Sequence, residues 1–341
     1  MRHFKQHFLP IHSYQLFFLL TSCLIFSAII SSAQNYKTEK ARQGDGIYSL
    51  LKRNGLAPED YLDDFIKINK SDLGEDNMLF VGHTYKLPVI KHIINQGYLT
   101  YKIFGKKYQK VPILDHQLKG AVYYLVSGHG GPDPGAIGYY GRHMLTEHEY
   151  AYDVTLRLAR RLIQHGAVVY MIIRQKDGIR DQRYLQAHHR RAVCYPNQKI
   201  PLNQLKRLRQ RKDAVNKLYI KNKGKFQRLI VIHIDSRSKG ENIDVFFYHD
   251  KRSTTGEKMA DILQHTLKEK YDYYQPNRGY HGTVSTRNLY MLKYTYPTTV
   301  FMELGNINHK RDQLRFMLAS NRQALSEWLT EGIIKDFKEN K

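Results

Sequence analysis

The fold is decided by residues 121–136, which read AVYYLVSGHGGPDPGA. The run from Ala121 to Val126 is apolar throughout, and a run of this length is typical of a strand buried on both faces. It leads into a glycine-rich segment that carries His129. The carboxyl ends of strands line the ligand crevice of open α/β sheets, so the sequence places His129 where a site is expected.

Three further residues occupy comparable positions. His233 ends the apolar run 229–232, Glu303 ends the run 300–302, and Glu147 opens the first long helical pattern. Two imidazoles and a carboxylate at such positions can hold Zn²⁺ with a fourth position open, and another carboxylate can then act on the bound water. Taken singly, each residue has a simpler interpretation, such as a hydrogen-bonded histidine or an exposed glutamate. Their joint arrangement is what favours a metal site.

From residue 120 onward, apolar strand patterns alternate with helical patterns. In addition to the three runs above, strands are expected at 167–173 and 243–248. The expected helices include 156–162, 205–218, 255–271 and 311–338. Such alternation predicts an α/β fold with a mainly parallel, twisted sheet and helices on both faces.

Several motifs in this part of the chain recur together in one known family. They are GHGGPDPGA at 128–136, Glu147, Arg174 with Asp177, Leu208 with Arg211 and Asn216, VIHID at 231–235 and ELGN at 303–306. From about Ala121 to Phe337 the chain resembles the zinc-dependent N-acetylmuramoyl-L-alanine amidases, the type often called amidase 3. The expected catalytic domain covers 121–338. The resemblance implies the amidase 3 fold and hydrolysis of the amide bond between N-acetylmuramic acid and L-alanine in peptidoglycan.

The resemblance also implies a role for each candidate residue. His129, Glu147 and His233 would bind one Zn²⁺, and Glu303 would be the catalytic base. The register of the helix that follows favours Glu147 over Glu149 as the matching residue. Two other interpretations stay open: a catalytically silent glycan-binding regulator, and another zinc hydrolase such as a peptidase acting on the stem peptides.

The chain departs from the family pattern in three places. Asp235 stands where the family usually has Asn, and Asn306 stands where it usually has Phe. An insertion at about 178–207 is longer than the family usually carries. These departures leave the implied metal ligands intact and concern neighbouring contacts and substrate preference.

A small unit is expected at 43–88, before the catalytic domain. It begins with GDGIYSLL at 44–51 and ends with LFVGHTYKLP at 79–88. This unit resembles a LysM module, with departures at Gly46, Ile47 and His83, and the resemblance implies binding to glycans that contain N-acetylglucosamine. The alternative is a small βααβ domain without a ligand. Residues 89–120 form the expected connector, with a hairpin or edge strand and no assigned chemistry.

The first 33 residues have the layout of a secretory signal peptide: a basic start, an apolar run and a small-residue end at Ala33. The alternative is an uncleaved membrane anchor, although the apolar run is short for a spanning helix. Cys23 weakly suggests a lipoprotein site. Removal of 1–33 would leave Cys194 as the single cysteine, so no intramolecular disulfide could form. We therefore expect an exported protein of a bacterial periplasm or envelope, with no membrane span after cleavage.

The net charge of +23 favours anionic partners. For an exported protein these are peptidoglycan and other anionic envelope polymers. Nucleic acid is not expected, because no nucleic-acid-binding motif is present. The sequence identifies no activator protein. The segment 190–228 carries 13 Lys or Arg residues and one acid, Asp213. It is interpreted either as a solvated helix face with a loop, or as an electrostatic contact surface for the wall.

Overall fold

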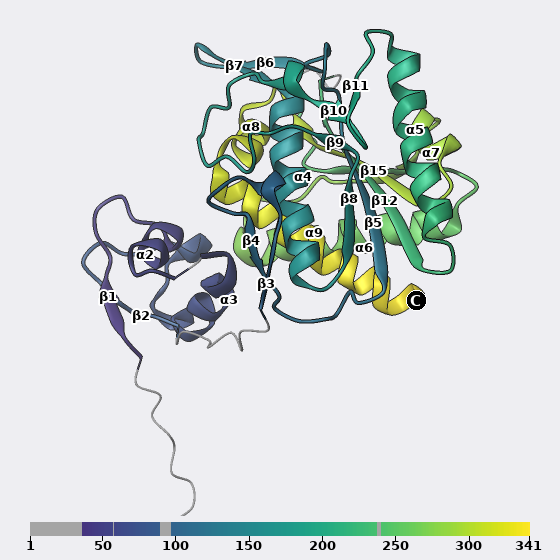
Figure 1. The fold of residues 1–341 in the computed structure, drawn as a ribbon. Helices are drawn as coiled ribbons and strands as arrows, with labels where there is room; N and C mark the ends of the chain where they lie inside the picture. Colours follow the sequence, from purple (N-terminus) through teal and green to yellow (C-terminus); the bar gives the residue numbers. More distant parts are fainter. Residues whose placement is uncertain (1–35, 57, 89–96, 237–239) are drawn as a thin grey trace, which may run out of the picture.

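The computed structural model describes residues 36–56, 58–88, 97–236 and 240–341 (Figure 1). The expected signal peptide at 1–33 lies outside the described residues. No helix within the described ranges is long and apolar enough to cross a membrane.

The N-terminal unit is a βααβ arrangement. Strand β1 (Thr38–Lys40) pairs antiparallel with β2 (Thr84–Lys86), and helices α2 (Ile47–Arg53) and α3 (Pro58–Ile68) lie between them in sequence. The unit has a separate core, in which Leu50 and Phe65 from the helices pack with Tyr85. Short 3₁₀ turns at Lys70–Asp72 and Glu75–Asn77 lead from α3 toward β2. Strand β1 precedes the bounds 43–88 expected from the sequence.

Two short strands follow the N-terminal unit. Strand β3 (Tyr98–Thr100) and β4 (Lys110–Pro112) pair antiparallel, with a 3₁₀ turn at Lys102–Phe104 between them. Phe104 and Val111 are buried in the main core. This segment of the expected connector is therefore packed against the domain that follows it.

The central sheet has six strands in the order β14-β13-β15-β12-β5-β8. Their bounds are Val284–Thr286, Phe246–His249, Thr298–Asn306, Phe226–Asp235, Ala121–Ser127 and Val168–Met171, in that order. Strands β15, β12, β5 and β8 are parallel, as the sequence predicts, whereas β13 is antiparallel to β15 and β14 follows the direction of β13. The sheet is therefore mixed but mainly parallel, because four of its five strand pairs are parallel and only the pair of β13 with β15 is antiparallel. Residues 236–245 are too few for the crossover that a parallel β13 would need.

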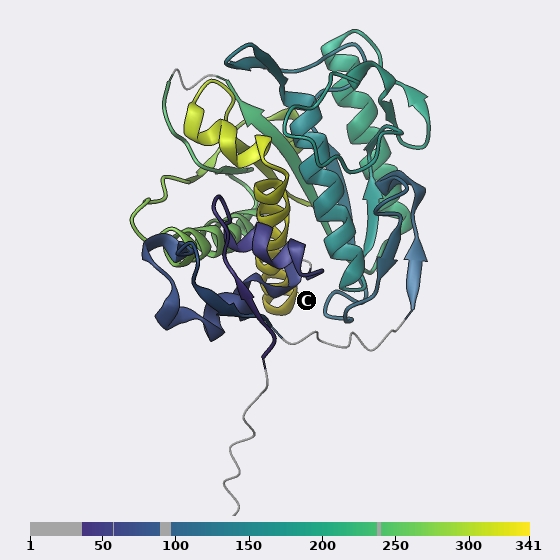
Figure 2. The same ribbon diagram turned by 90° about the vertical axis from the view of Figure 1, so that its left-hand side faces the viewer.

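Helices cover both faces of this sheet (Figures 1 and 2). On one face lie α4 (Glu147–Gln164), α6 (Thr254–Tyr274) and α9 (Ala319–Asn340), in one core with Tyr123 and Ile230. On the other face lie α5 (Gln204–Lys221) and α7 (Tyr290–Tyr294), in a second core with Val122 and Val231. Alternate residues of β5 and β12 thus enter opposite cores, as the two-residue repeat of a strand requires.

Two expected elements differ in extent from those in the structure. The single helix expected at 311–338 is divided into α8 (Lys310–Met317) and α9, because Leu318 has an extended backbone. The strand expected from 243 begins only at Phe246, after Asp244 with its positive φ of 54°.

Smaller strands gather at the carboxyl end of the parallel strands, at the top of Figure 1. Strands β6 (Ile137–Tyr140) and β7 (His143–Thr146) form a hairpin directly before α4. Strand β9 (Ile173–Arg174) pairs with β10 (Val193–Cys194), and β10 pairs with β11 (Gln198–Lys199). The expected insertion at 178–207 therefore folds over this end of the sheet.

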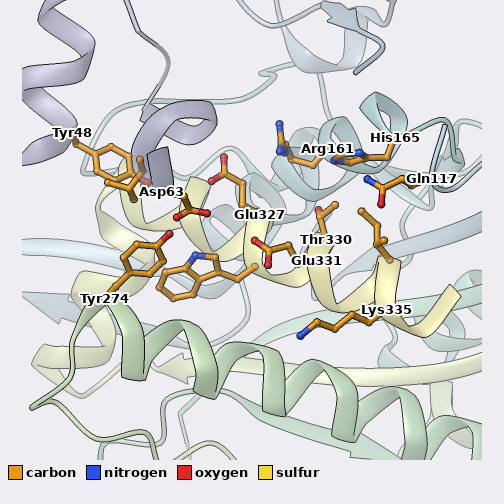
Figure 3. Close-up of a pocket in the computed structure, with 13 residues that line it drawn as sticks. Tyr48, Asp63, Gln117, Arg161, His165, Tyr274, Glu327, Thr330, Glu331 and Lys335 are labelled. Carbon is orange, nitrogen blue, oxygen red and sulfur yellow. The ribbon is translucent and has the colours of Figure 1, made fainter. Parts of the chain in front are cut away.

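A pocket of about 370 Å³ lies between the N-terminal unit and the larger domain (Figure 3). Tyr48 and Asp63 of the unit face Glu327 and Glu331 of α9 across it. Arg161 and His165, at the end of α4, also line it. An 18-residue helix is about 27 Å long, so this pocket is far from Glu147 at the start of α4.

Candidate metal centre

His129 lies just beyond β5, where two close approaches of the backbone require glycine. A Cβ atom on Gly128 would lie 2.5 Å from the His233 ring, and one on Gly135 would lie 2.7 Å from both the His129 ring and Glu147 Oε2. His129 itself has a φ of 57°, a left-handed conformation that is unusual for a residue with a side chain. The glycine-rich segment is therefore shaped around the imidazoles and the carboxylate.

Glu147 joins the two imidazoles. It is the first residue of α4, and its Oε2 lies 3.0 Å from His129 Nε2 while its Oε1 lies 2.7 Å from His233 Nδ1. One ligand atom from each of the three residues lies within 4.8 Å of the others. The backbone N–H groups of Ala136 and Ile234 donate to the two carboxylate oxygens. The structure thus brings together all three residues that the resemblance implies as ligands.

His129 is held from its outer side by Asp133 and α5. Asp133 Oδ2 lies 2.9 Å from His129 Nδ1 and also accepts a hydrogen bond of 2.6 Å from Arg207 Nη2. Arg211 donates to the His129 carbonyl oxygen. Because the Nδ1 atom of His129 is occupied by Asp133, Nε2 is the nitrogen that faces Glu147 and His233.

Burial and the neighbouring charges shift the pKa values of these groups in opposite directions. Burial alone would lower the pKa of His129, but the Glu147 charge and hydrogen bonds from Asp133 and Glu147 raise it to about 9. Burial would likewise raise the pKa of Glu147, yet the two histidines hold it well below the usual range. Burial lowers the pKa of His233 despite the neighbouring carboxylate. Glu147 therefore remains ionised in a buried site, as a ligand for a cation must.

Glu303 lies beside this cluster on the neighbouring strand. It is the register partner of His233 in the β12–β15 pair, and it is partly exposed. Phe301, two residues earlier on the same face of β15, stacks on the His233 ring with centroids 4.6 Å apart. Adjacent strands lie about 4.8 Å apart, so Glu303 projects on the same face of the sheet as His233.

Glu149, the other candidate at the start of α4, points away from the cluster. Its carboxylate binds Arg180 Nη2 at 2.7 Å and accepts from the backbone N–H of His188 at 2.6 Å. It thereby holds the insertion against α4. Glu147 is consequently the acidic residue of this turn that the structure places with the histidines.

Two of the three departures from the expected family pattern lie next to the centre. Asp235 and Asn306 are register partners just beyond His233 and Glu303. Asn306 is buried, and its side-chain amide donates to the Glu241 carbonyl oxygen. Asn306 therefore holds the backbone at Glu241, shortly before β13.

The sequence did not reveal that Arg207 lies near the metal centre. It falls in the basic segment 190–228, where it counts as a candidate surface charge, but only 8% of it is exposed. That expectation is wrong for Arg207, because its guanidinium turns inward to Asp133. Arg207 lies one turn before Arg211 on the same face of the helix, and this spacing is the signal that could have identified Arg207 as an inward-facing residue.

The residues fit a zinc ion. Two imidazoles, each of which can bind a metal through an unprotonated ring nitrogen, and one ionised carboxylate form a common donor set for catalytic zinc. The Asp133 contact to the outer nitrogen of His129 is the usual support for a zinc-binding histidine. Within the described residues, this is the one cluster of His, Cys, Asp and Glu with metal-binding spacing.

Comparison with known proteins identifies one matching family. A family model described as N-acetylmuramoyl-L-alanine amidase matches residues 124–335, which is more than half of the chain. A search of curated proteins gave no match. Similar solved structures include the amidase AmiC2 of Nostoc punctiforme, with 18% identity and a TM-score of 0.45, over 65% of this chain and 99% of that one.

Two other solved structures are similar to the same degree. The amidase CwlD of Clostridioides difficile, solved in complex with the GerS lipoprotein, shows 18% identity and a TM-score of 0.48, over 64% of this chain and 99% of that one. The amidase Ami1 of Mycobacterium smegmatis shows 17% identity and a TM-score of 0.47, over 65% and 99%. At these values, the assignment to a family rests on the family model.

Proposed function

The chain belongs to the N-acetylmuramoyl-L-alanine amidase family, and we propose that it hydrolyses the amide bond between N-acetylmuramic acid and the L-alanine of the stem peptide. One observation carries the proposal: His129, Glu147 and His233 converge within 4.8 Å, and Glu303 lies on the strand beside His233. That arrangement has the ligands and the base that a metal-assisted amide hydrolysis requires.

His129 Nε2, Glu147 and a ring nitrogen of His233 would hold one zinc ion. When bound, zinc supplies a water of lowered pKa and a positive charge next to the carbonyl oxygen of the substrate. The chain itself supplies the orientation. Asp133 and Arg211 fix the ring and the backbone of His129, while two backbone N–H groups fix the carboxylate of Glu147.

Glu303 would move the proton. Its carboxylate accepts a proton from the attacking water, which then adds to the amide carbonyl carbon. The protonated Glu303 passes that proton to the nitrogen of L-alanine, so the C–N bond breaks and a free amine leaves. The carboxylate is thereby regenerated, and general acid–base transfer of this kind typically contributes about 10²- to 10⁴-fold.

A digest of purified peptidoglycan, read by mass spectrometry, tests the proposal. We expect stem peptides with a free L-alanine amine and glycan strands with a free lactyl carboxyl group. A metal chelator should stop their release, and added zinc should restore it. Cuts within the stem peptide would instead identify a peptidase, and no cut with intact wall binding would identify a silent glycan-binding regulator.

We further propose that the N-terminal unit holds glycan. Its βααβ order suits the LysM resemblance, and three apolar side chains before β2 are exposed: Met78, Phe80 and Val81. Exposed aromatic and aliphatic groups of this kind can pack on the apolar face of a sugar ring. Replacing Phe80 and Val81 by Ser should weaken sedimentation with insoluble wall and leave cleavage of small soluble muropeptides unchanged. Equal loss on both substrates would contradict this division of labour.

The export of the protein is also a proposal, and it rests on residues 1–33 alone. Cells that produce the full chain should accumulate a shortened form outside the cytoplasm. Intact mass measurement would show a start at Gln34 if cleavage occurs. A protein of full length in the membrane fraction would indicate the anchor instead.

A further inference from the structure

Helix α5 has two faces of opposite character. Its inner face is buried and includes Arg207, Arg211 and Leu218. On its outer face, four basic side chains are exposed: Lys206, Arg209, Lys217 and Lys221. At about 100° per residue these four positions lie within one side of the helix, and they extend over about 22 Å of its length.

A groove of about 800 Å³ runs along this outer face. One wall is α5 with all four basic residues, and the other is formed by Tyr195, Pro196 and Gln198 at the turn between β10 and β11. We call this site the basic groove. An extended chain that lies along this groove can reach all four cationic side chains.

The positive charge of the basic groove is largely uncompensated. Asp213 is the one acidic residue that lines it, and Asp213 is already paired with Lys212. Among the described parts of the chain, no carboxylate lies within ion-pair distance of the four basic residues of the groove. Like charges arranged along a concave surface concentrate the field there and attract an extended anion.

The end of α5 that carries Lys206 is the end that contacts the metal centre. Lys206 is adjacent in sequence to Arg207, whose guanidinium binds Asp133 next to His129. A chain held along α5 would therefore be bound to the outer face of the helix whose inner face contacts the centre. Binding in the groove uses none of the three candidate metal ligands, so the inference does not require that the proposed reaction is correct.

We propose that the basic groove binds a linear, phosphate-bearing polyanion one strand wide. Ammonium groups bind phosphate as point charges, and the guanidinium of Arg209 can contact two phosphate oxygens at once. Four cations spaced along 22 Å of helix, as estimated from its rise per residue, match repeated charges along one strand. In a bacterial envelope such a ligand would keep the enzyme on the wall while the catalytic site acts.

The test measures binding of long-chain polyphosphate to the full mature protein by fluorescence anisotropy or calorimetry. In the test variant, Lys206, Arg209, Lys217 and Lys221 are all replaced by Gln. In the control variant, the residues replaced by Gln lie across the sheet: Lys258 and Lys268 on α6, Lys338 on α9, and Lys341 directly after α9. The two variants have the same net charge, and thermal melting confirms that both remain folded.

We expect the test variant to bind at least about 16-fold more weakly at low salt, because each of the four exposed charges contributes roughly a factor of two or more. The dependence of log K on log salt should become shallower by about three, since four phosphate contacts are lost. The control variant should change affinity less than twofold. Inorganic phosphate should bind far more weakly than the polymer, because the groove acts through several linked contacts.

Three outcomes would overturn the inference. Equal loss of affinity in the two variants would show that net charge, and not the groove, attracts the polymer. Binding to vesicles containing phosphatidylglycerol, lost in the test variant, with no binding to polyphosphate, would identify a membrane surface instead. A marked preference for nucleic acid over polyphosphate at equal phosphate concentration would indicate recognition of bases.

Discussion

Helices α4 and α5 have the same length and approach the same histidine from opposite faces of the sheet. Each has 18 residues. Helix α4 is buried along most of its length between the sheet and α9, and it contributes Glu147 directly to the centre. Helix α5 is buried on one face only and reaches His129 through Asp133 and the backbone.

The difference shows two ways of supporting one site. A helix enclosed by the core places a ligand accurately, since its position is fixed by packing on all sides. A helix packed on one side can support the same centre indirectly, through residues that contact a ligand. Its outer face then remains accessible to a second binding partner.

Glu303→Gln should have the largest effect, because β15 supplies the proposed base and neither helix can replace it. The amide can donate and accept hydrogen bonds, but it cannot take a proton from water. We expect turnover to fall by about 10²- to 10⁴-fold, with the bound zinc and the melting temperature unchanged. Steady-state kinetics on soluble muropeptides would measure this effect. A wild-type rate would show that Glu303 is structural.

Glu147→Gln tests the direct contribution of α4. The variant loses the charge that links the two histidines, so zinc affinity should fall by more than about 100-fold, the upper range for supporting contacts. Competition with a chromophoric chelator gives the affinity. Glu149→Gln is not a neutral control, because Glu149 binds Arg180. His143→Gln, at the exposed first position of β7, serves instead. Unchanged zinc affinity in Glu147→Gln would remove α4 from the centre.

Arg207→Gln tests the indirect contribution of α5. Asp133 would lose its ion pair and hold the His129 ring less firmly, so zinc affinity should fall by about 10- to 100-fold. Arg190→Gln, an exposed arginine in the same basic segment, is the matched control and should leave the affinity unchanged. Equal affinities in both variants would mean that α5 only packs against the sheet.

The smallest effect concerns the open face of α5. Lys217→Ala should change the free energy of unfolding by less than about 0.5 kcal/mol, because the side chain is exposed. The adjacent Leu218→Ala should cost about 2–4 kcal/mol, because Leu218 is 4% exposed within the core. Urea denaturation would compare the two. A large cost at Lys217 would show that the outer face is needed for folding.

Much of the sheet could be predicted because buried parallel strands are apolar and continuous. The runs that end at His233 and Glu303 became β12 and β15, and their register places the two side chains on one face. An apolar run does not indicate, however, in which direction its strand runs within the sheet. The antiparallel orientation of β13 therefore could not be derived from its sequence. That orientation follows from the short segment before Phe246.

The candidate site was predictable where its residues follow strands and not where they lie on a basic helix. A chain-wide charge count cannot distinguish Arg207, which faces Asp133, from Arg209, which faces solvent. The spacing of buried positions along α5 distinguishes them only after the inner face of the helix is known. The role of Arg207 therefore emerged from three-dimensional contacts.

The zinc content of the purified mature chain tests the central claim most directly. If His129, Glu147 and His233 form the metal centre, elemental analysis should find one zinc per chain, and Glu147→Gln should contain far less. Zinc far below one per chain in a preparation with full amidase activity would contradict the account.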